Sequence, residues 1–108
     1  MTDLDPIARP LDHLPARGAS DAPALTDRAG SLSFRELDHA IGALAAWLAA
    51  RAGSGDRVAS WLPKTRVACI LPLAAARAGL VHVPVNPALR RAQVAHILAD
   101  SEIGRAHV

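Results

Sequence analysis

The clearest pattern along the chain is the regular recurrence of apolar residues between Ser33 and Ala52. These residues fall at spacings of three and four, which is the period of one helix face: Phe34, Leu37, Ile41, Leu44 and Leu48. Ser33 and Glu36 form a Ser-x-x-Glu capping box at the start of the stretch, and a Gly-Ser-Gly run follows its end. We therefore predict an amphipathic helix over residues 33–52 that buries one face.

Two short apolar runs lie on either side of a second helical stretch. Arg57–Trp61 and Leu80–Val83 are typical of buried strands, and the second is bounded by a glycine and by Pro84. Thr65–Ala78 connects them, and two strands joined through a helix lie parallel. Pro72 lies inside this helix and predicts a kink or a late helix start, because proline has no N–H to donate.

A further helix is predicted beyond Asn86-Pro87, which ends the second strand. Val94, Ile97 and Leu98 form one apolar stripe on that helix. Upstream of the main helix, residues 22–26 and 31–33 are short strand candidates joined by a turn at 27–30. We expect these two segments to form a small hairpin.

Residues 1–21 form an N-terminal segment with weaker order in its pattern. Four apolar residues recur at helical spacing, namely Leu4, Ile7, Leu11 and Leu14. Asp5-Pro6 is a suitable helix start, but Pro10 and Pro15 interrupt the pattern. We expect a short, broken helix on the surface.

Composition narrows the possible classes of protein. The chain has 108 residues, enough for one small domain, and 51% hydrophobic residues, which argues against disorder. No apolar run approaches the roughly 18–20 residues of a membrane span, and the acidic N-terminus lacks an apolar signal core. The net charge is +2 with both signs interspersed, which excludes an obvious nucleic-acid surface. The lone Cys69 excludes an internal disulfide and lies in an apolar helical setting, so we expect a buried, inert thiol and a cytoplasmic protein.

Four motifs in this order resemble the N-terminal subdomain of the AMP-forming adenylate ligases. They are Gly55–Val58, Arg77–Gly79, Val83–Pro87 and Gln93–Ser101. The superfamily includes acyl-CoA synthetases, luciferases and the adenylation domains of peptide synthetases, and the resemblance covers about residues 22–101. It implies an α/β fold with a small hairpin, a parallel βαβ unit and flanking helices. Leu62-Pro63-Lys64, with Val83–Pro87 and Gln93–Leu98, further resembles the acyl-CoA ligases found beside exosortase systems.

The resemblance implies an enzyme that activates a carboxylic acid with ATP and Mg²⁺, forms an acyl-adenylate and passes the acyl group to a thiol, often coenzyme A. That chemistry needs a phosphate loop with lysine, acidic metal ligands and a lysine for the leaving charge. None of these motifs is found in the chain, so we interpret it as an N-terminal fragment without the remaining ligase domains. We assign it no catalytic, cofactor-binding or metal-binding residue. The alternatives are an adenylation domain of a peptide synthetase and a truncated product that is not an enzyme.

Several residues resemble parts of functional motifs, but we assign them no chemical role. Gly53-Ser54-Gly55 follows a helix and precedes a strand, which is the wrong order for a dinucleotide-binding turn. The only lysine, Lys64, lies in a loop. Asp56 and Asn86 are expected to shape turns, and His82 is expected to be packed or to lie at a seam between subdomains. The histidines show no metal-ligand spacing: His13, His39, His82, His96 and His107.

The tail Glu102–Val108, EIGRAHV, departs from the resemblance, which implies another apolar strand here. The codons GAG ATC GGA AGA GCA CAC GTC, followed by the stop TGA, encode these residues and coincide with a common sequencing-library adapter. We therefore interpret residues 102–108 as translated adapter. The alternative is an ordinary polar C-terminal tail.

Overall fold

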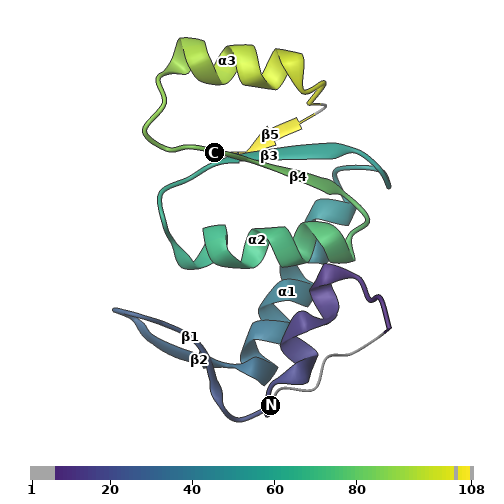
Figure 1. The fold of residues 1–108 in the computed structure, drawn as a ribbon, viewed down its shortest axis with the longest axis vertical. Helices are drawn as coiled ribbons and strands as arrows, with labels where there is room; N and C mark the ends of the chain where they lie inside the picture. The colour runs from purple at the N-terminus through teal and green to yellow at the C-terminus, as the bar shows by residue number, and fades with distance from the viewer. Residues whose placement is uncertain (1–6, 104, 108) are drawn as a thin grey trace.

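The computed structural model describes residues 7–103 and 105–107 of the chain, with the backbone alone described for the last three. Two helical layers enclose a parallel sheet, and an antiparallel hairpin projects beside them (Figure 1). The sheet has three strands in the order β4 (Val81–Val85), β3 (Arg57–Trp61), β5 (Arg105–His107), and the hairpin pairs β1 (Pro23–Asp27) with β2 (Gly30–Ser33). The α/β prediction, with its hairpin and parallel βαβ unit, is confirmed. Among the described residues, no helix is long and apolar enough to cross a membrane.

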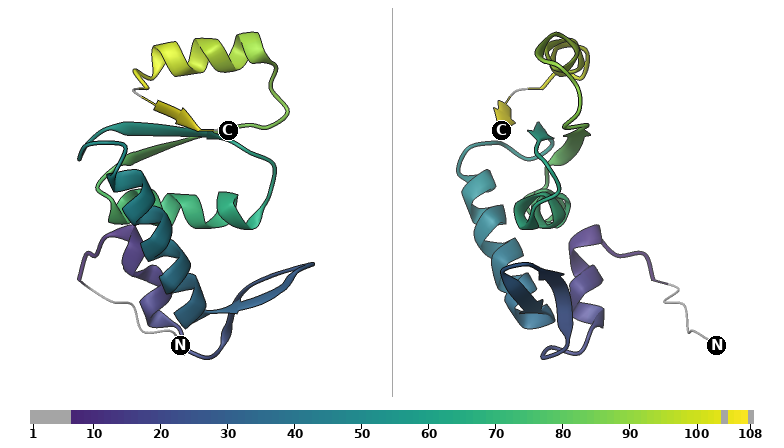
Figure 2. Two further views of the ribbon diagram at one scale, coloured as in Figure 1. Left: turned by 180° about the vertical axis from the view of Figure 1, so that it is seen from behind. Right: turned by 90° about the vertical axis from the view of Figure 1, so that its left-hand side faces the viewer.

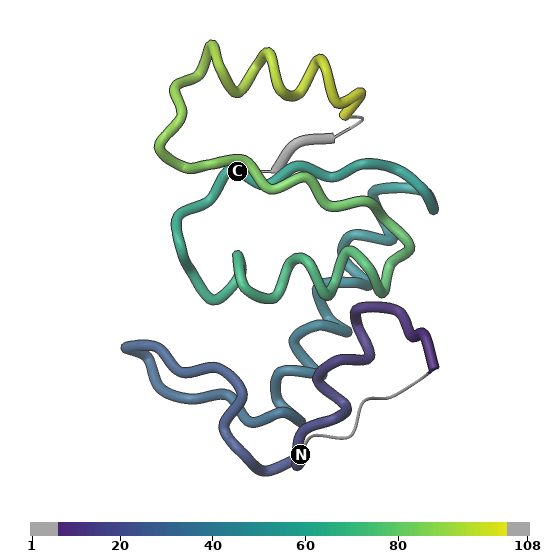
Figure 3. The backbone as a smooth tube through the Cα atoms, in the orientation of Figure 1, coloured from purple at the N-terminus to yellow at the C-terminus, as the bar shows by residue number. Residues whose placement is uncertain are grey.

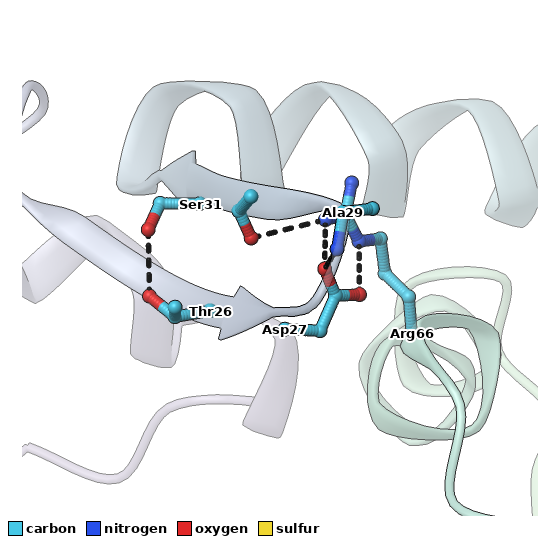
Figure 4. Close-up of polar contacts among 6 residues, drawn as sticks. Thr26, Asp27, Ala29, Ser31 and Arg66 are labelled. Carbon is cyan, nitrogen blue, oxygen red and sulfur yellow. Dashed lines mark hydrogen bonds and ion pairs between the residues drawn. The ribbon is translucent and has the colours of Figure 1, made fainter.

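The hairpin is formed by β1 (Pro23–Asp27) and β2 (Gly30–Ser33), each within a residue of its predicted bounds. Thr26 and Ser31 lie opposite each other, and their hydroxyl oxygens are 2.7 Å apart (Figure 4). Such cross-strand hydroxyl pairs support a short ladder that has little apolar surface of its own.

Helix α1 (Phe34–Ala49) begins at the predicted capping box and ends three residues before the predicted limit of residue 52. The Glu36 amide donates to Ser33 Oγ at 3.1 Å, and the Ser33 amide donates to Glu36 Oε1 at 2.9 Å. The buried residues of the helix are Leu37, Ile41, Ala45 and Leu48, while Phe34 and Leu44 of the predicted face are only partly buried. The Phe34 ring lies so close to Gly18 that a Cβ there would approach it to 2.6 Å.

The βαβ unit consists of β3 (Arg57–Trp61), α2 (Arg66–Arg77) and β4 (Val81–Val85). The two strands are parallel, as predicted. Thr65 caps α2, since its hydroxyl accepts from the Ala68 amide at 3.2 Å. Cores on opposite sides of the sheet share these strands, because successive side chains of a strand point to opposite faces.

Pro72 predicted a kink or a late helix start; the late start is wrong, and the kink stays a prediction. Helix α2 begins at Arg66 and continues through Pro72 without interruption. The helix keeps this course because Ile70, Leu71, Ala74 and Ala75 on its inner face are all buried, and that packing outweighs one missing bond. The Ala68 carbonyl is the acceptor that a residue with an N–H at position 72 would use.

The predicted end of the second strand at Val83 is also wrong, because Pro84 lies inside β4. β4 is an edge strand, and the Val81 amide donates inward to the Asp56 carbonyl at 2.8 Å. Alternate residues face alternate sides of a ladder, so Pro84 directs its nitrogen to the free edge, where no donor is needed.

Helix α3 (Arg91–Asp100) covers the face of the sheet opposite α1 and α2 (Figure 2). Val94 is buried against Ala59 and Val85, while Ile97 and Leu98 are partly buried in the same cluster. The apolar stripe predicted for this helix is therefore confirmed.

The N-terminal segment contains a 3₁₀ helix, η1 (Leu11–Arg17), which lies beside α1 and α2 (Figures 1 and 3). Ile7, Leu11 and Leu14 of this segment are each more than half exposed, whereas Asp12 is buried. Arg77 explains the reversal, because its Nε donates to Asp12 Oδ2 at 3.1 Å and its Nη2 donates to Asp38 Oδ1 at 2.8 Å. Leu4 and the expected helix start at Asp5-Pro6 lie outside the described residues.

The tail adds a short strand, β5 (Arg105–His107), parallel to β3. Strand pairing uses the backbone N–H and C=O groups, which every residue except proline offers in full. The strand therefore does not distinguish translated adapter from an ordinary tail at residues 102–108. Before the strand, Glu102 adopts a left-handed conformation with φ of 54°.

Candidate functional site

The described residues contain one polar side-chain pair within the sheet, Ser60 on β3 and His82 on β4. Ser60 Oγ and His82 Nε2 are 2.7 Å apart. Ser60 is buried and His82 is half-buried, and burial lowers the pKa of His82 below its usual value. A neutral imidazole at pH 7 can either donate to or accept from the hydroxyl, depending on its tautomer.

Strand alternation explains how the pair forms. Val58 belongs to the core on the α1 and α2 side, so Ser60, two residues later, faces the same side. Leu80 belongs to that core too, and His82 follows it at the same interval. Sequence reasoning singled out His82 but missed Ser60. The signal that could have identified Ser60 is a hydroxyl on the buried face of a predicted strand, next to a strand that carries a histidine on the same face.

A hollow of about 670 Å³ lies between α2 and this side of β4. Its lining is mostly apolar, with the polar pair on one wall and Leu11 of η1 as the part contributed from the N-terminal segment. The hollow is framed by residues from several segments, among them Leu11, Ser60, Pro72, His82 and Asn86.

A second, wider groove of about 810 Å³ runs between α1 and α2 and is almost entirely apolar. Trp47 and Val67 lie in it with 42% and 51% of their surface exposed, which is high for large apolar side chains. The guanidinium of Arg51 lies 3.9 Å from the Trp47 ring centroid, so a cation covers part of the indole.

The Ser60–His82 pair does not form a nucleophile–base–orienter set. Such a set needs a third group, usually a carboxylate, that orients the imidazole. Among the described hydrogen bonds, His82 is bonded to Ser60 and to no carboxylate. The described residues also contain no group of three or more His, Cys, Asp and Glu side chains able to hold a metal ion.

The turn at Gly53-Ser54-Gly55 is poorly suited to hold phosphates, because the amides of both glycines already have partners. The Gly53 amide donates to Asp56 Oδ2 at 2.8 Å, and the Gly55 amide donates to the Gly79 carbonyl at 2.7 Å. Asp56 therefore shapes the turn before β3, as predicted. Lys64 is exposed in its loop. These described residues do not fit ATP or Mg²⁺, and no catalytic step can be derived from them.

The remaining candidates are placed on the surface. His13, His39 and His96 are exposed, while the side chain of His107 lies outside the described residues. Asn86 shapes a turn as predicted, since its Oδ1 accepts from the Ala88 amide at 2.9 Å.

The prediction of a buried Cys69 is wrong, because this thiol is exposed. An apolar run does not say which way a helix turns. Ile70 and Leu71 face the core, and Cys69 lies on the other side of α2.

The βαβ unit and its hairpin are those of an adenylate-forming ligase, and the chain belongs to the AMP-binding enzyme family, whose sequence profile matches residues 13–106. Medium-chain fatty-acid–CoA ligase from Escherichia coli is 38% identical over 85 residues, which is 77% of this chain and 15% of that enzyme. Surfactin synthase subunit 3 from Bacillus subtilis is 38% identical over 110 residues, which is 94% of this chain and 9% of that protein.

Solved structures agree with this family. The chain is similar to apo MatB from Rhodopseudomonas palustris, with a TM-score of 0.76 and 32% identity over 81% of this chain and 18% of MatB. It is also similar to the NpsA N-terminal subdomain from Klebsiella oxytoca in complex with anthranilyl-AMSN, with a TM-score of 0.75 and 29% identity over 80% of this chain and 23% of that one. The chain thus spans less than a quarter of each of these relatives.

Proposed function

We propose that this chain is the N-terminal scaffold of a cytoplasmic AMP-forming ligase that activates a carboxylic acid with ATP and passes the acyl group to coenzyme A. The family match across β3, α2 and β4 carries the proposal. In this function the chain supplies a docking framework, with ATP, Mg²⁺ and coenzyme A bound by parts of the ligase that it does not contain. We expect the chain by itself to be inactive, because its sequence lacks the phosphate loop with lysine and the acidic metal ligands that this chemistry needs.

The fatty-acid–CoA ligase of E. coli supports coenzyme A as the acceptor. The finer assignment, to the acyl-CoA ligases found beside exosortase systems, rests on the motif resemblance at Leu62–Lys64 and Val83–Pro87 and belongs to the same proposal.

An adenylation domain of a peptide synthetase is the second candidate. Surfactin synthase subunit 3 matches more of this chain than the E. coli ligase does, at the same identity. Both classes share the βαβ scaffold, so the acceptor thiol distinguishes them. A coenzyme A ligase releases a soluble thioester, whereas an adenylation domain loads the thiol of a carrier domain.

The deciding experiment begins by recovering the full reading frame from the source DNA and purifying its product. We expect pyrophosphate exchange into ATP that depends on an added carboxylic acid, followed by thioester formation with free coenzyme A. Loading of a carrier domain without a coenzyme A product would favour the second candidate. A product without acid-dependent exchange would refute both. Exchange by the 108-residue chain alone would refute its role as a scaffold.

We further propose that residues 102–108 are translated adapter following the segment 22–101, although the family profile itself extends to residue 106. The left-handed Glu102 supports this, since glycine or asparagine is usual at that position after a helix. The nucleotide sequence tests the proposal directly. A different series of codons, or genomic DNA that continues the same reading, would overturn it.

A further inference from the structure

The N-terminal segment 7–17 lies against α1 and α2 but adds little to the apolar cores. Neither hydrophobic cluster of the described residues has a member from this segment. Its buried residues are Asp12 and Pro15, while its larger apolar side chains are more than half exposed. Apolar burial therefore holds the segment weakly, because the hydrophobic gain is proportional to the apolar area removed from water.

The chain that follows this segment, from Gly18 to Ala22, is fixed to the start of α1. The Phe34 ring lies against Gly18, and the Phe34 amide donates to the Ala22 carbonyl at 3.1 Å. The Arg35 amide donates to the Ser20 carbonyl at 3.0 Å. The described backbone hydrogen bonds of η1 itself, in contrast, join residues three apart. The segment can therefore move away as one piece without losing its own backbone bonds or those of its base.

Arg77 makes the polar link from α2 to this segment. Its Nε donates to Asp12 Oδ2 at 3.1 Å, and its Nη2 donates to the Asp12 carbonyl at 3.3 Å. The Asp12 side chain is only 11% exposed, so the bound segment places a carboxylate among protein atoms, where it needs a partner. The position of the segment thus depends on one charged contact more than on packing.

Opening of this contact leaves neither charge buried without a partner. Arg77 keeps Asp38, because its Nη2 donates to Asp38 Oδ1 at 2.8 Å and its Nη1 donates to the Asp38 carbonyl at 3.4 Å. Asp12 returns to water when the segment leaves. Breaking a buried ion pair is costly mainly when it leaves one charge uncompensated, and that does not happen here. The contact can therefore open without unfolding the core.

We propose that residues 7–17 form a strap that Arg77 holds closed through Asp12, and that this strap opens and closes while the α/β core stays folded. Leu11 of the strap lines the hollow between α2 and β4, which Ser60 and His82 also line. Opening of the strap therefore removes one wall of the hollow and exposes the polar pair. The inference concerns the chain itself and holds whichever thiol the intact ligase uses.

The test is thiol labelling of the 108-residue chain displayed as single molecules, with Cys69→Ser as the background. Pro15→Cys reports opening of the strap and Ala45→Cys reports unfolding of the core, because both positions are buried in the closed structure. We expect the thiol at position 15 to react at least about tenfold faster than the thiol at position 45. Asp12→Ala should raise the rate at position 15 by a further factor of about ten, because it removes a charged hydrogen-bond pair, and should change the rate at position 45 by less than about threefold.

His13→Ala is the matched control, because His13 is the exposed neighbour of Asp12 on the strap, and it should leave both rates unchanged. Equal rates at positions 15 and 45, in either the original chain or Asp12→Ala, would show that the strap opens only with the core and would overturn the inference. A rate at position 15 that Asp12→Ala leaves within about threefold would overturn it too, because Arg77 would then not hold the strap.

A third reporter tests the effect on the hollow. Ser60→Cys places a thiol at a buried position in the wall of the hollow with little change in size. Its labelling should rise with Asp12→Ala by the same factor as labelling at position 15. A rate that stays with that of position 45 would show that the strap does not cover the polar pair, and would overturn this part of the inference.

Discussion

Replacing Glu102 by glycine is expected to stabilise the chain. Glu102 has φ of 54°, and among the described residues other than glycine it is the one with a positive φ. In the left-handed region the Cβ approaches the following carbonyl oxygen too closely, and glycine has no Cβ. The residue is held there by the way α3 ends, so the strain persists in the folded chain.

The end of α3 is a Schellman motif. The Ile103 amide donates to the Leu98 carbonyl at 3.2 Å, and the Glu102 amide donates to the Ala99 carbonyl at 3.3 Å. Leu98 and Ile103 also belong to the same partly buried cluster, which is the apolar contact that accompanies this motif. Relaxing Glu102 to a right-handed conformation would break both hydrogen bonds. The left-handed conformation is therefore kept despite its backbone strain.

Three effects set the size of the change. Left-handed backbone costs a residue with a Cβ about 1–2 kcal/mol. Ordering a glycine offsets about 0.5–1 kcal/mol of this gain, because glycine loses more conformational freedom on folding than other residues do. The substitution also removes the ion pair between Arg57 Nη1 and Glu102 Oε2, 3.0 Å apart. Its carboxylate side is 82% exposed, so the pair is worth at most about 0.5 kcal/mol. The net expectation is about 0.5 kcal/mol of stabilisation.

The assay should exclude aggregation, because the chain exposes apolar surface at Trp47, Val67 and Val81. Protease resistance of single displayed molecules meets this need and reports the free energy of unfolding. Glu102→Gln is the matched control, since it removes the charge but keeps the Cβ and the strain. It should be neutral or destabilising by no more than about 0.5 kcal/mol. If Glu102→Gly is no more stable than the original chain while Glu102→Gln is neutral, backbone strain at this position is not the governing effect.

Burial lowers the pKa of His82, so protonation of this histidine is less favourable in the folded chain than in the unfolded one. Its contribution to stability is therefore fully present above the unfolded pKa of about 6.5 and is lost as the pH falls towards the folded pKa. His82→Gln should remove this loss of stability in acid, whereas His96→Gln at an exposed position should not. The hydrogen bonds from Arg66 lower the pKa of Asp27, so that pair stabilises the chain above about pH 4 and is lost in stronger acid; Asp27→Asn should flatten this part of the pH profile, and an unchanged profile would contradict the reasoning. Cys69 should react with a thiol reagent in the folded chain at a rate within about tenfold of the rate in urea, because the thiol is exposed; a reaction that waits for unfolding would show that it is covered.

Local signals predicted the parts of the fold that local interactions decide. The capping box at Ser33 fixes where α1 begins, because both hydrogen bonds join residues three apart. The strand at 57–61 was predicted with its bounds, because a short segment between the turn at Asp56 and the proline at position 63 has few alternatives. The sequence also predicted the turn at Asp56 for the same reason, as its bond to Gly53 is local.

Features decided by distant partners could not be predicted. Asp12 is buried beneath an exposed apolar stripe because Arg77, 65 positions away, binds it. Arg66 reaches from α2 to Asp27 at the hairpin with bonds of 2.7 Å and 3.0 Å, as Figure 4 shows. The strand through Pro84 depends on β4 lying at the sheet edge, which is a property of topology and not of the residues nearby.

The distribution of polar contacts supports a scaffold role more strongly than the absence of motifs does. Arg77 joins η1, α1 and α2, because its guanidinium contacts Asp12 and Asp38 at once. Arg66 joins the hairpin to α2 in the same way, and Arg57 joins β3 to the end of α3 through the Ser101 carbonyl at 3.0 Å. A catalytic cation has to be available to substrate, whereas these three guanidinium groups are engaged in joining elements. If the intact ligase adenylates a carboxylic acid, the positive charge that steadies the phosphates therefore has to come from residues outside these links.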